Sequence, residues 1–250
     1  MINVHFITCF CKEDTTSKIA KLFTRGIREM TGIVQAQTVV IPSHATHDNI
    51  YAYNLWLKKM TNPGHGVHKF SVGDRVVQLI NSPNIPCATV TNRLDDLMAD
   101  PYALNMKDPV VDVYNHSSRI YNRYGVYSGE EGTVIDVNDE REMVRVFFDN
   151  GYIADYRFGP EARSFDFSYA TSLQRHQGKT HQAVILDAWQ MFTGMINVNF
   201  MNALINSAEK ELYILGDNLS LDALMAAINE NENLMSKIKV CNEEIHFPIW

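Results

Sequence analysis

The sequence is poor in cysteine, has no long apolar run and has no excess of positive charge. It holds four cysteines, none of them in a Cys-x-x-Cys pair, and its start lacks a charged region followed by a long apolar stretch. These absences argue against a disulfide framework and a secretory signal. No stretch approaches 18 uninterrupted apolar residues, the length of a membrane span. We therefore expect a reduced, cytoplasmic protein without a membrane partner.

The charge balance is acidic, with 22 Lys and Arg against 29 Asp and Glu and a net charge of −7. This balance argues against a broad basic surface for nucleic acid, but it leaves room for a local basic groove. A hydrophobic content of 46% and a charged content of 20% are ordinary for a globular protein. The 250 residues suffice for one large domain or two small ones.

The amino-terminal part follows an α/β pattern. Residues 2–10 are dominated by apolar side chains and predict a buried strand. Residues 14–17, Asp-Thr-Thr-Ser, can cap a following helix, whose apolar stripe lies between residues 19 and 27 and which Gly32 would end. Residues 34–41 could form a second strand. A strand, a cap and an amphipathic helix together open an α/β unit.

The middle of the chain begins with weaker patterns. Residues 42–68 are rich in turn formers and predict a connection of low regularity, with a short helical patch at residues 51–60. Residues 70–79, which contain Val-Gly-Asp-Arg-Val-Val, indicate a turn that leads into a strand. Residues 82–125 are polar and interrupted by prolines, so they predict an irregular insertion.

A clear β pattern follows in residues 126–164. Residues 129–137 predict a turn and a strand, and residues 143–148 predict a second strand. The Asp-Asn-Gly sequence at residues 149–151 is a strong hairpin signal, which makes residues 152–158 the third strand. Three short antiparallel strands with tight turns suggest a small SH3-like barrel.

The last part of the chain returns to the α/β pattern. It predicts a strand at residues 183–187, a helix at residues 198–208, a closing strand at residues 211–216 and a helix at residues 219–228. Asp187 ends the first of these strands. In an α/β sheet that place suits either a site residue or, more commonly, a helix-capping residue.

The most informative segment is residues 172–180, Ser-Leu-Gln-Arg-His-Gln-Gly-Lys-Thr. It lies between the extended run 165–171 and the strand 183–187. Backbone N–H groups beside a glycine can approach an anion closely, so this polar loop suits contact with phosphates. The plain alternative is an ordinary polar turn between two strands.

This segment resembles the fifth conserved motif of RecD-like superfamily 1 DNA helicases, which reads roughly Thr-Ile-His-Lys-Ser-Gln-Gly-x-Thr. Gln174 stands where the family has His, and His176 stands where it has a small residue. The other segments follow in the order of that family's carboxy-terminal half, which makes the likeness more specific than one motif. The positions that fit the motif are Ser172, Leu173, Arg175, Gln177, Gly178 and Thr180.

The resemblance implies an α/β fold. A RecA-like parallel sheet with helices on both faces would be formed by residues 1–81 and 165–250, the second RecA-like helicase domain. It would be interrupted by the irregular insertion 82–125 and by a small antiparallel SH3-like β-barrel at residues 126–164. In the family this barrel contacts single-stranded DNA. Aromatic side chains in small barrels are more often core, and the candidates for contact are Tyr152, Tyr156, Arg145 and Arg157.

The resemblance also implies two sets of site residues in the loop. The first set, at the DNA, is Ser172, Arg175 and Thr180. The second set, facing the nucleotide, is Gln177, Gly178 and Lys179.

Two features depart from the family. Aligned from the strand 211–216, Ser207 takes the place of the arginine finger, which stabilises charge on the γ-phosphate. Nothing matches the phosphate loop Gly-x-x-x-x-Gly-Lys-Ser/Thr, since Leu173 stands where the first glycine should precede Gly178-Lys179-Thr180. ATP and Mg²⁺ are therefore expected as cofactors only if a partner chain or an upstream segment supplies the first RecA-like domain.

Two functions follow as hypotheses. The first is the carboxy-terminal portion of an ATP-dependent DNA helicase, which binds single-stranded DNA and contributes half of the nucleotide cleft. The alternative is a non-catalytic helicase-derived module that binds nucleic acid or a protein partner. In either case the isolated chain is expected to be inactive as an ATPase.

Four histidines form two His-x-x-His pairs, His44 with His47 and His65 with His68. Four imidazoles could bind zinc. No cysteine pair or close carboxylate pattern supports them, so we predict no metal site.

Overall fold

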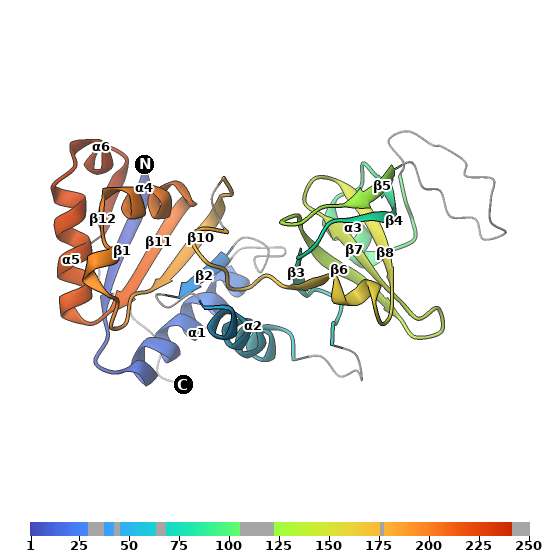
Figure 1. Ribbon diagram of the computed structural model, residues 1–250, viewed down its shortest axis with the longest axis horizontal. Coiled ribbons are helices and arrows are strands. Elements are labelled where there is room, and N and C mark those ends of the chain that lie inside the picture. Colours follow the sequence, from blue (N-terminus) through green and yellow to red (C-terminus); the bar gives the residue numbers. More distant parts are fainter. Residues whose placement is uncertain (30–37, 43–45, 64–68, 106–122, 176–177, 242–250) are drawn as a thin grey trace. The chain divides into compact units, whose positions relative to one another are not determined.

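The chain forms two compact units, Met1–Met60 with Tyr169–Trp250 and Thr61–Ser168. The structure is a computed structural model and is shown in Figure 1. Each unit is described by itself. The structure describes residues 1–29, 38–42, 46–63, 69–105, 123–175 and 178–241.

The first unit is built on a five-stranded sheet with the strand order β12-β1-β11-β10-β2. Every pairing in this sheet is parallel. The inner strands are apolar on both faces because helices cover both sides, as expected for a parallel sheet. The strands are β1 (Ile2–Thr8), β2 (Thr38–Pro42), β10 (His181–Asp187), β11 (Ala208–Gly216) and β12 (Ile238–Cys241).

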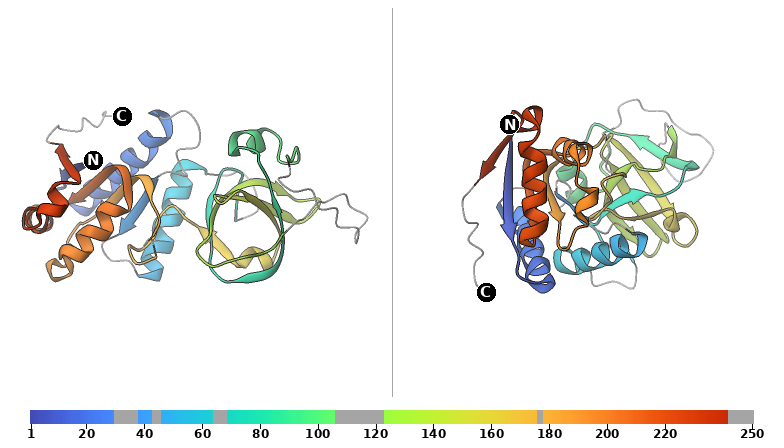
Figure 2. Two further views of the ribbon diagram at one scale, coloured as in Figure 1. Left: turned by 90° about the horizontal axis from the view of Figure 1, so that it is seen from above. Right: turned by 60° about the vertical axis from the view of Figure 1, so that its left-hand side comes forward.

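Helices flank both faces of this sheet (Figure 2). Helices α4, α5 and α6 lie on one face, where a large apolar cluster includes Val4, Leu204, Leu212 and Leu224. Helix α1 packs on β10 and β11 from the other face, and its buried side chains include Ile19. The helices of this unit are α1 (Lys12–Glu29), α2 (His47–Thr61), α4 (Val198–Asn206), α5 (Asn218–Asn229) and α6 (Glu232–Met235).

The second unit is a seven-stranded antiparallel sheet with the order β5-β4-β8-β7-β6-β3-β9. The sheet curls into a barrel-like form (Figure 2), and helix α3 (Leu94–Ala99) packs beside β6. The strands are β3 (Arg75–Gln78), β4 (Ser82–Thr89), β5 (Arg123–Val126), β6 (Glu131–Asn138), β7 (Met143–Phe148), β8 (Tyr152–Arg157) and β9 (Phe165–Phe167).

These two sheets confirm the predicted fold class. The parallel sheet with helices on both faces has the form of a RecA-like domain, and an antiparallel barrel-like unit interrupts it in the chain. The predicted hairpin between β7 and β8 is also present. Gly151 adopts φ +86°, a left-handed conformation that glycine takes at little cost, and Phe148 then pairs with Tyr152.

Several predicted elements differ in the structure. Helix α1 begins at Lys12, so residues 14–17 lie inside its first turns and do not cap it. Helix α2 spans His47–Thr61, longer than the predicted patch, and makes much of the expected loop regular. The strand predicted at residues 211–216 is present within β11, which lies between β1 and β10 at the centre of the sheet. Gly32 lies outside the described residues.

The range 82–125, expected to be an irregular insertion, contains β4 and α3 in its described part. Its prolines suggested a loop, but the pairing of β4 with β5 is irregular between Ser82 and Pro86, which is where a sheet accommodates proline. Strands β3 and β4 also belong to the antiparallel sheet, although they lie outside the predicted barrel range 126–164. A single strand gives no sign of which sheet it will join.

The barrel residues considered for DNA contact are mostly internal. Tyr152 and Tyr156 are fully buried, as expected of aromatic core residues. Arg145 is 5% exposed and forms two hydrogen bonds to the Asp155 carboxylate, at 2.7 and 2.9 Å. Arg157 is the one of the four that is exposed.

None of the helices in the described ranges is long and apolar enough to cross a membrane.

The buried Arg145–Asp155 pair gives a stability prediction for the second unit. Asp155→Ala leaves the guanidinium buried without its carboxylate, so we expect a loss of about 3–5 kcal/mol in the free energy of unfolding. Urea unfolding of the variant and the unaltered chain measures this loss. The control is Glu140→Ala, which removes an exposed carboxylate. Equal losses in the two variants would contradict the prediction.

Candidate nucleic-acid site

The segment 172–180 leads into the amino-terminal end of β10. Before it, the extended run 165–171 changes sheets. Its first residues form β9 of the antiparallel sheet, and Ala170 then forms an isolated parallel bridge with Val40 of β2. The loop therefore begins beside one strand of the parallel sheet and ends at the start of the next.

The first half of the loop is held in place by its own residues. The Ser172 hydroxyl oxygen accepts a hydrogen bond from the backbone N–H of Arg175 at 3.2 Å. Between them, Leu173 packs against the apolar core and anchors the loop to the sheet. Gln174 and Arg175 are exposed, so the loop that this hydroxyl fixes carries a positive charge at the surface.

The second half of the loop lies nearer β11. Gly178 is exposed and adopts φ +82°, with no atom within 4 Å of the place a Cβ would take, so its need for glycine is conformational. The Thr180 hydroxyl donates to Oε1 of Glu209 at 3.3 Å. Lys179 is half-buried. Gln177 and His176 lie outside the described residues.

The predicted loop residues thus fall in two places. Ser172 and Arg175 lie together, whereas Thr180 lies beside an acidic side chain, which disfavours a phosphate. Ser207 is close to this second place, because its carbonyl accepts the backbone N–H of His181 at 2.9 Å. The Ser207 side chain is 3% exposed and donates to the Leu204 carbonyl at 2.5 Å. It presents no group to a phosphate.

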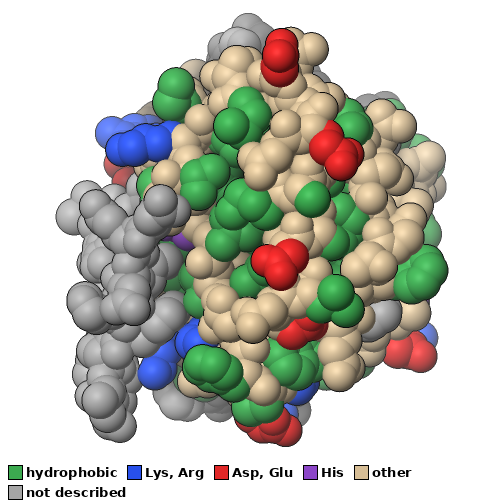
Figure 3. Space-filling view, turned by 90° about the vertical axis from the view of Figure 1, so that its left-hand side faces the viewer, with side chains coloured by type: hydrophobic (Ala, Val, Ile, Leu, Met, Phe, Trp, Pro, Cys, Tyr) green, Lys and Arg blue, Asp and Glu red, His purple; other side chains and the backbone are tan. Residues whose placement is uncertain are grey.

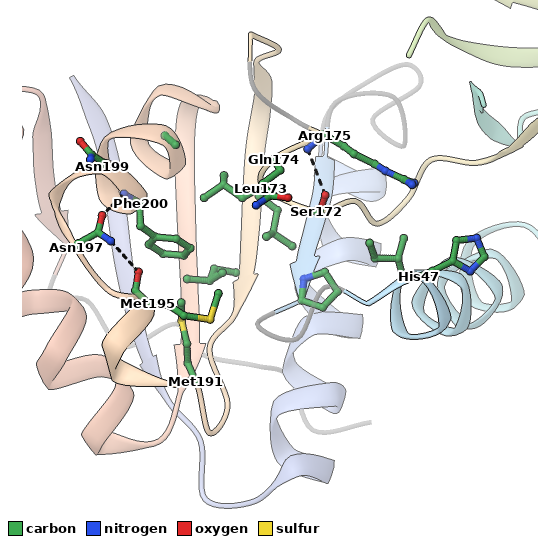
Figure 4. A pocket seen from close by; sticks show the side chains of 15 residues that line it. His47, Ser172, Leu173, Gln174, Arg175, Met191, Met195, Asn197, Asn199 and Phe200 are labelled. Carbon is green, nitrogen blue, oxygen red and sulfur yellow. Dashed lines mark hydrogen bonds between the residues drawn. The ribbon is translucent and has the colours of Figure 1, made fainter. Parts of the chain in front are cut away.

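A pocket of ≈ 630 Å³ opens beside Ser172 and Arg175. Figure 4 shows these two residues and His47 on one side of it and Phe200 with the methionines on the other. Such a volume, with an apolar floor and a few polar groups, suits a small ligand. The lining residues are Ile41, Pro42, His47, Ile50, Ser172, Leu173, Gln174, Arg175, Leu186, Met191, Met195, Asn197, Asn199, Phe200 and Ala203.

The wall opposite the loop is fixed by helix termini. Asn197 caps α4, since its side-chain oxygen accepts the backbone N–H of Phe200 at 3.0 Å. Asp217 caps α5 through Ser220 and also accepts the backbone N–H of Gln190 at 2.7 Å. The Ser220 hydroxyl accepts the backbone N–H of Met191 at 3.2 Å. The segment after β10 is therefore tied to the start of α5.

The sequence did not point to this wall. Its residues carry no motif, and they reach the pocket only because β10 ends beneath them and α4 folds back over the sheet. The one signal available was Asn197, which precedes an apolar helical run as an N-cap residue does.

A polar cluster lies at the carboxyl edge of the sheet. Asp187, whose side chain is 1% exposed, bonds to Nζ of Lys12 at 2.5 Å and accepts a hydrogen bond from the Tyr53 hydroxyl. Its other oxygen accepts the backbone N–H of Trp189 at 3.1 Å. Burial and the Asp187 charge raise the pKa of Tyr53, so its hydroxyl stays protonated as the donor. The cluster joins β10, α1 and α2.

Neither a metal nor a nucleotide site is complete in the described residues. Of the four predicted histidines, His47 alone is described, and no group of three metal-ligating side chains occurs in the described ranges. Gly178-Lys179-Thr180 leads into a strand, whereas a phosphate loop opens a helix whose N-terminus binds the anion. With Ser207 buried as well, the residues present do not fit ATP by themselves.

The face of the first unit seen in Figure 3 carries few positive charges. Figure 3 views it from the side of α5 and shows mainly uncharged and acidic side chains, with few Lys or Arg. This agrees with the net charge of −7. A polyanion would find its attraction in a local site and not on that face.

No family model and no curated protein matches this sequence. Among solved structures, it is similar to a Bacteroides Pif1 helicase in complex with ADP-AlF3 and single-stranded DNA, at 12% identity and a TM-score of 0.43, covering 87% of this chain and 51% of that one. It is also similar to the Pif1 helicase from Candida albicans, at 15% identity and a TM-score of 0.38, covering 88% of this chain and 54% of that one. The chain spans about half the length of these structures. With TM-scores below 0.5, these likenesses add nothing to the functional argument.

Asp217 gives a prediction that depends on pH. Burial opposes its ionisation, but hydrogen bonds from Ser220 and Gln190 outweigh burial and lower its pKa below the ordinary 3.8. Asp217→Ala should therefore cost about 0.5–2 kcal/mol of unfolding free energy at neutral pH. Because the folded-state pKa is the lower one, this difference persists down to the ordinary pKa and shrinks as the pH falls through the folded-state value.

Urea unfolding of both proteins between neutral pH and the acid range measures that difference. Asp222→Ala is the matched control, since Asp222 is an exposed carboxylate on the same helix. A cost that stays constant through the acid range would show that the charge of Asp217 is not what holds α5.

Proposed function

We propose that this chain binds single-stranded DNA as the carboxy-terminal portion of a RecD-like superfamily 1 helicase. Its first unit would be the second RecA-like domain, and its barrel-like unit would be the SH3-like insertion. The proposal is supported by the motif-like loop 172–180 together with the parallel sheet into which that loop leads.

The observation that carries the proposal is the pairing of Ser172 with Arg175. The hydroxyl fixes the backbone of Arg175 and leaves its guanidinium exposed. Among the described residues, this guanidinium has no ion-pair partner. A hydroxyl and an exposed cation on one short loop are groups that can contact phosphates, and such contacts carry most of the affinity for a nucleic-acid backbone. Thr180, which bonds to Glu209, contributes less in this proposal.

The nucleotide half of the proposal needs a second domain. Gln177, Gly178 and Lys179 would face a nucleotide that a phosphate-loop domain holds, and ATP with Mg²⁺ would bind only in that assembly. The chain itself would supply a surface for DNA. It would supply no cation at the finger position, because the residue there is Ser207, which is buried.

The burial of Ser207 also favours a second candidate, a non-catalytic helicase-derived module that binds nucleic acid or a protein partner. The two candidates agree on nucleic-acid binding and differ in whether a motor is completed. The sequence encoded directly upstream separates them, because a phosphate-loop domain there supports the motor and its absence supports the module.

Arg175→Ala tests the DNA contact. We expect the affinity for a fluorescent oligothymidylate to fall about tenfold, since a hydrogen bond to a charged group is lost. The slope of log affinity against log salt should fall in magnitude by about 0.7, the value for one phosphate contact on a single strand. Fluorescence anisotropy titrations at several salt concentrations measure both quantities.

The control is Lys237→Ala, which removes an exposed positive charge near β12, in the same unit. It should leave both quantities unchanged. An equal effect of the two variants would indicate unspecific attraction, and undetectable binding of the unaltered chain would refute the proposal.

ATP hydrolysis provides a further prediction. With ATP, Mg²⁺ and single-stranded DNA, the isolated chain should release phosphate no faster than a protein-free blank, because it has neither the phosphate loop nor the finger. If the chain is joined to a phosphate-loop domain, Ser207→Arg should increase the rate. No increase would mean that Ser207 does not occupy the finger position.

A further inference from the structure

Asn54 on helix α2 is a buried amide that bonds to the segment from which the loop 172–180 starts. This segment, Tyr169-Ala170-Thr171, is where the chain returns to the first unit. Asn54 is 5% exposed, and Tyr169 and Ala170 are buried as well. The hydrogen bonds between them are therefore formed away from water, where every polar group of the backbone needs a partner.

One side of this segment is paired with β2. The backbone N–H of Val40 donates to the Tyr169 carbonyl at 3.0 Å, and the backbone N–H of Thr171 donates to the Val40 carbonyl at 3.0 Å. These two bonds form the parallel bridge between Val40 and Ala170. The N–H and the carbonyl of Ala170 itself point away from β2, to a side on which no further strand of the described sheet lies.

Asn54 takes the place of that missing strand. Its Oδ1 accepts the backbone N–H of Ala170 at 2.8 Å, and its Nδ2 donates to the Ala170 carbonyl at 3.1 Å. Oδ1 also accepts the backbone N–H of Tyr169 at 2.8 Å. A carboxamide carries an acceptor and donors on one planar group, as a peptide group does, so a single side chain satisfies all three backbone groups.

The bonds of this amide set the position from which the loop starts. Ser172 follows Ala170 by two residues, and its hydroxyl oxygen accepts the backbone N–H of Arg175 at 3.2 Å. Two short steps, each fixed by hydrogen bonds, thus lead from α2 to the exposed cation. Helix α2 is itself fastened to the end of β10, because the Tyr53 hydroxyl donates to Asp187.

We propose that Asn54 is a positioning residue for nucleic-acid binding: it touches no ligand, and it holds the start of the loop so that Arg175 meets a backbone phosphate. The inference rests on the proposed function and deepens it, because it gives α2 a part in a site whose contacts come from the loop. The plainer alternative is that Asn54 contributes to folding only. In that case its loss changes the free energy of unfolding and leaves the affinity of the folded chain as it is.

Asn54→Ala removes all three hydrogen bonds. We expect the affinity of the folded variant for the fluorescent oligothymidylate to fall about three- to tenfold, up to the loss expected for Arg175→Ala, because the cation is no longer held at the phosphate. The slope of log affinity against log salt should fall in magnitude by up to about 0.7. Anisotropy titrations of the full chain measure both quantities, and urea unfolding shows that the variant is folded under the same conditions.

A double variant with Arg175→Ala shows whether the two residues act through one contact. If Asn54 acts by placing Arg175, the double variant should lose about tenfold in affinity, as Arg175→Ala does alone. Independent effects would multiply to about 30- to 100-fold instead.

The matched control is Asn231→Ala. The Asn231 side chain also accepts two backbone N–H groups, from Asn233 at 3.0 Å and from Leu234 at 3.2 Å, but it caps α6 of the same unit and does not bond to the loop. It should lower the free energy of unfolding and leave both the affinity and the salt slope unchanged.

If Asn54→Ala does not fold, Asn54→Ser replaces it in the same set of variants. Its hydroxyl can still accept one of the two N–H groups, but it is too short to bond all three backbone groups. We expect the same pattern, a loss of affinity that disappears in the Arg175→Ala background.

The outcomes separate this inference from the proposed function. Unchanged affinity and slope in a folded Asn54 variant would overturn the inference and leave DNA binding standing. Losses that multiply in the double variant, or an equal loss in Asn231→Ala, would overturn it as well. If the unaltered chain does not bind the oligothymidylate, the proposed function fails and the inference fails with it.

Discussion

The parallel pairing of β10 with its two neighbours is the constraint on which the candidate site depends. Strand β10 pairs with β2 on one side and with β11 on the other, so three segments distant in sequence lie together. Because all run in one direction, the loop before β10 and the start of β11 share one edge of the sheet. The end of β10, where Asp187 lies, shares the other edge with the residues that follow β1.

This arrangement places two polar groups of different chemistry around β10. At the carboxyl edge a buried carboxylate is satisfied by Lys12 and Tyr53, which fastens two helices to the sheet. Beside the pocket, the loop leaves the cation of Arg175 without an ion-pair partner among the described residues. A satisfied cluster contributes to stability, whereas an exposed cation beside an apolar cavity is available to a ligand. The Asp187 cluster is therefore the better candidate for a structural role. The pocket beside Arg175 is the better candidate for a binding site.

The departures from the helicase pattern fit the same geometry. Ser207, which the resemblance aligns with the finger, follows α4 as its C-cap and turns its hydroxyl inward to a carbonyl. Thr180 bonds to Glu209, which places a negative charge where the resemblance implied contact with a polyanion. In the proposed function, nucleic-acid binding would therefore rest on Ser172 and Arg175, and Tyr152 and Tyr156 belong to the core of the barrel-like unit.

The sequence by itself determined the elements with strong local signals. The β7–β8 hairpin followed from Asp149-Asn150-Gly151, α5 followed from its apolar spacing, and the α/β class followed from their order. The tertiary structure alone decided that β3 and β4 join the antiparallel sheet, that β11 is central and that Phe200 and Arg175 line one pocket. These facts depend on which distant strands pair, and pairing is fixed by burial of whole faces, which no local pattern of residues records.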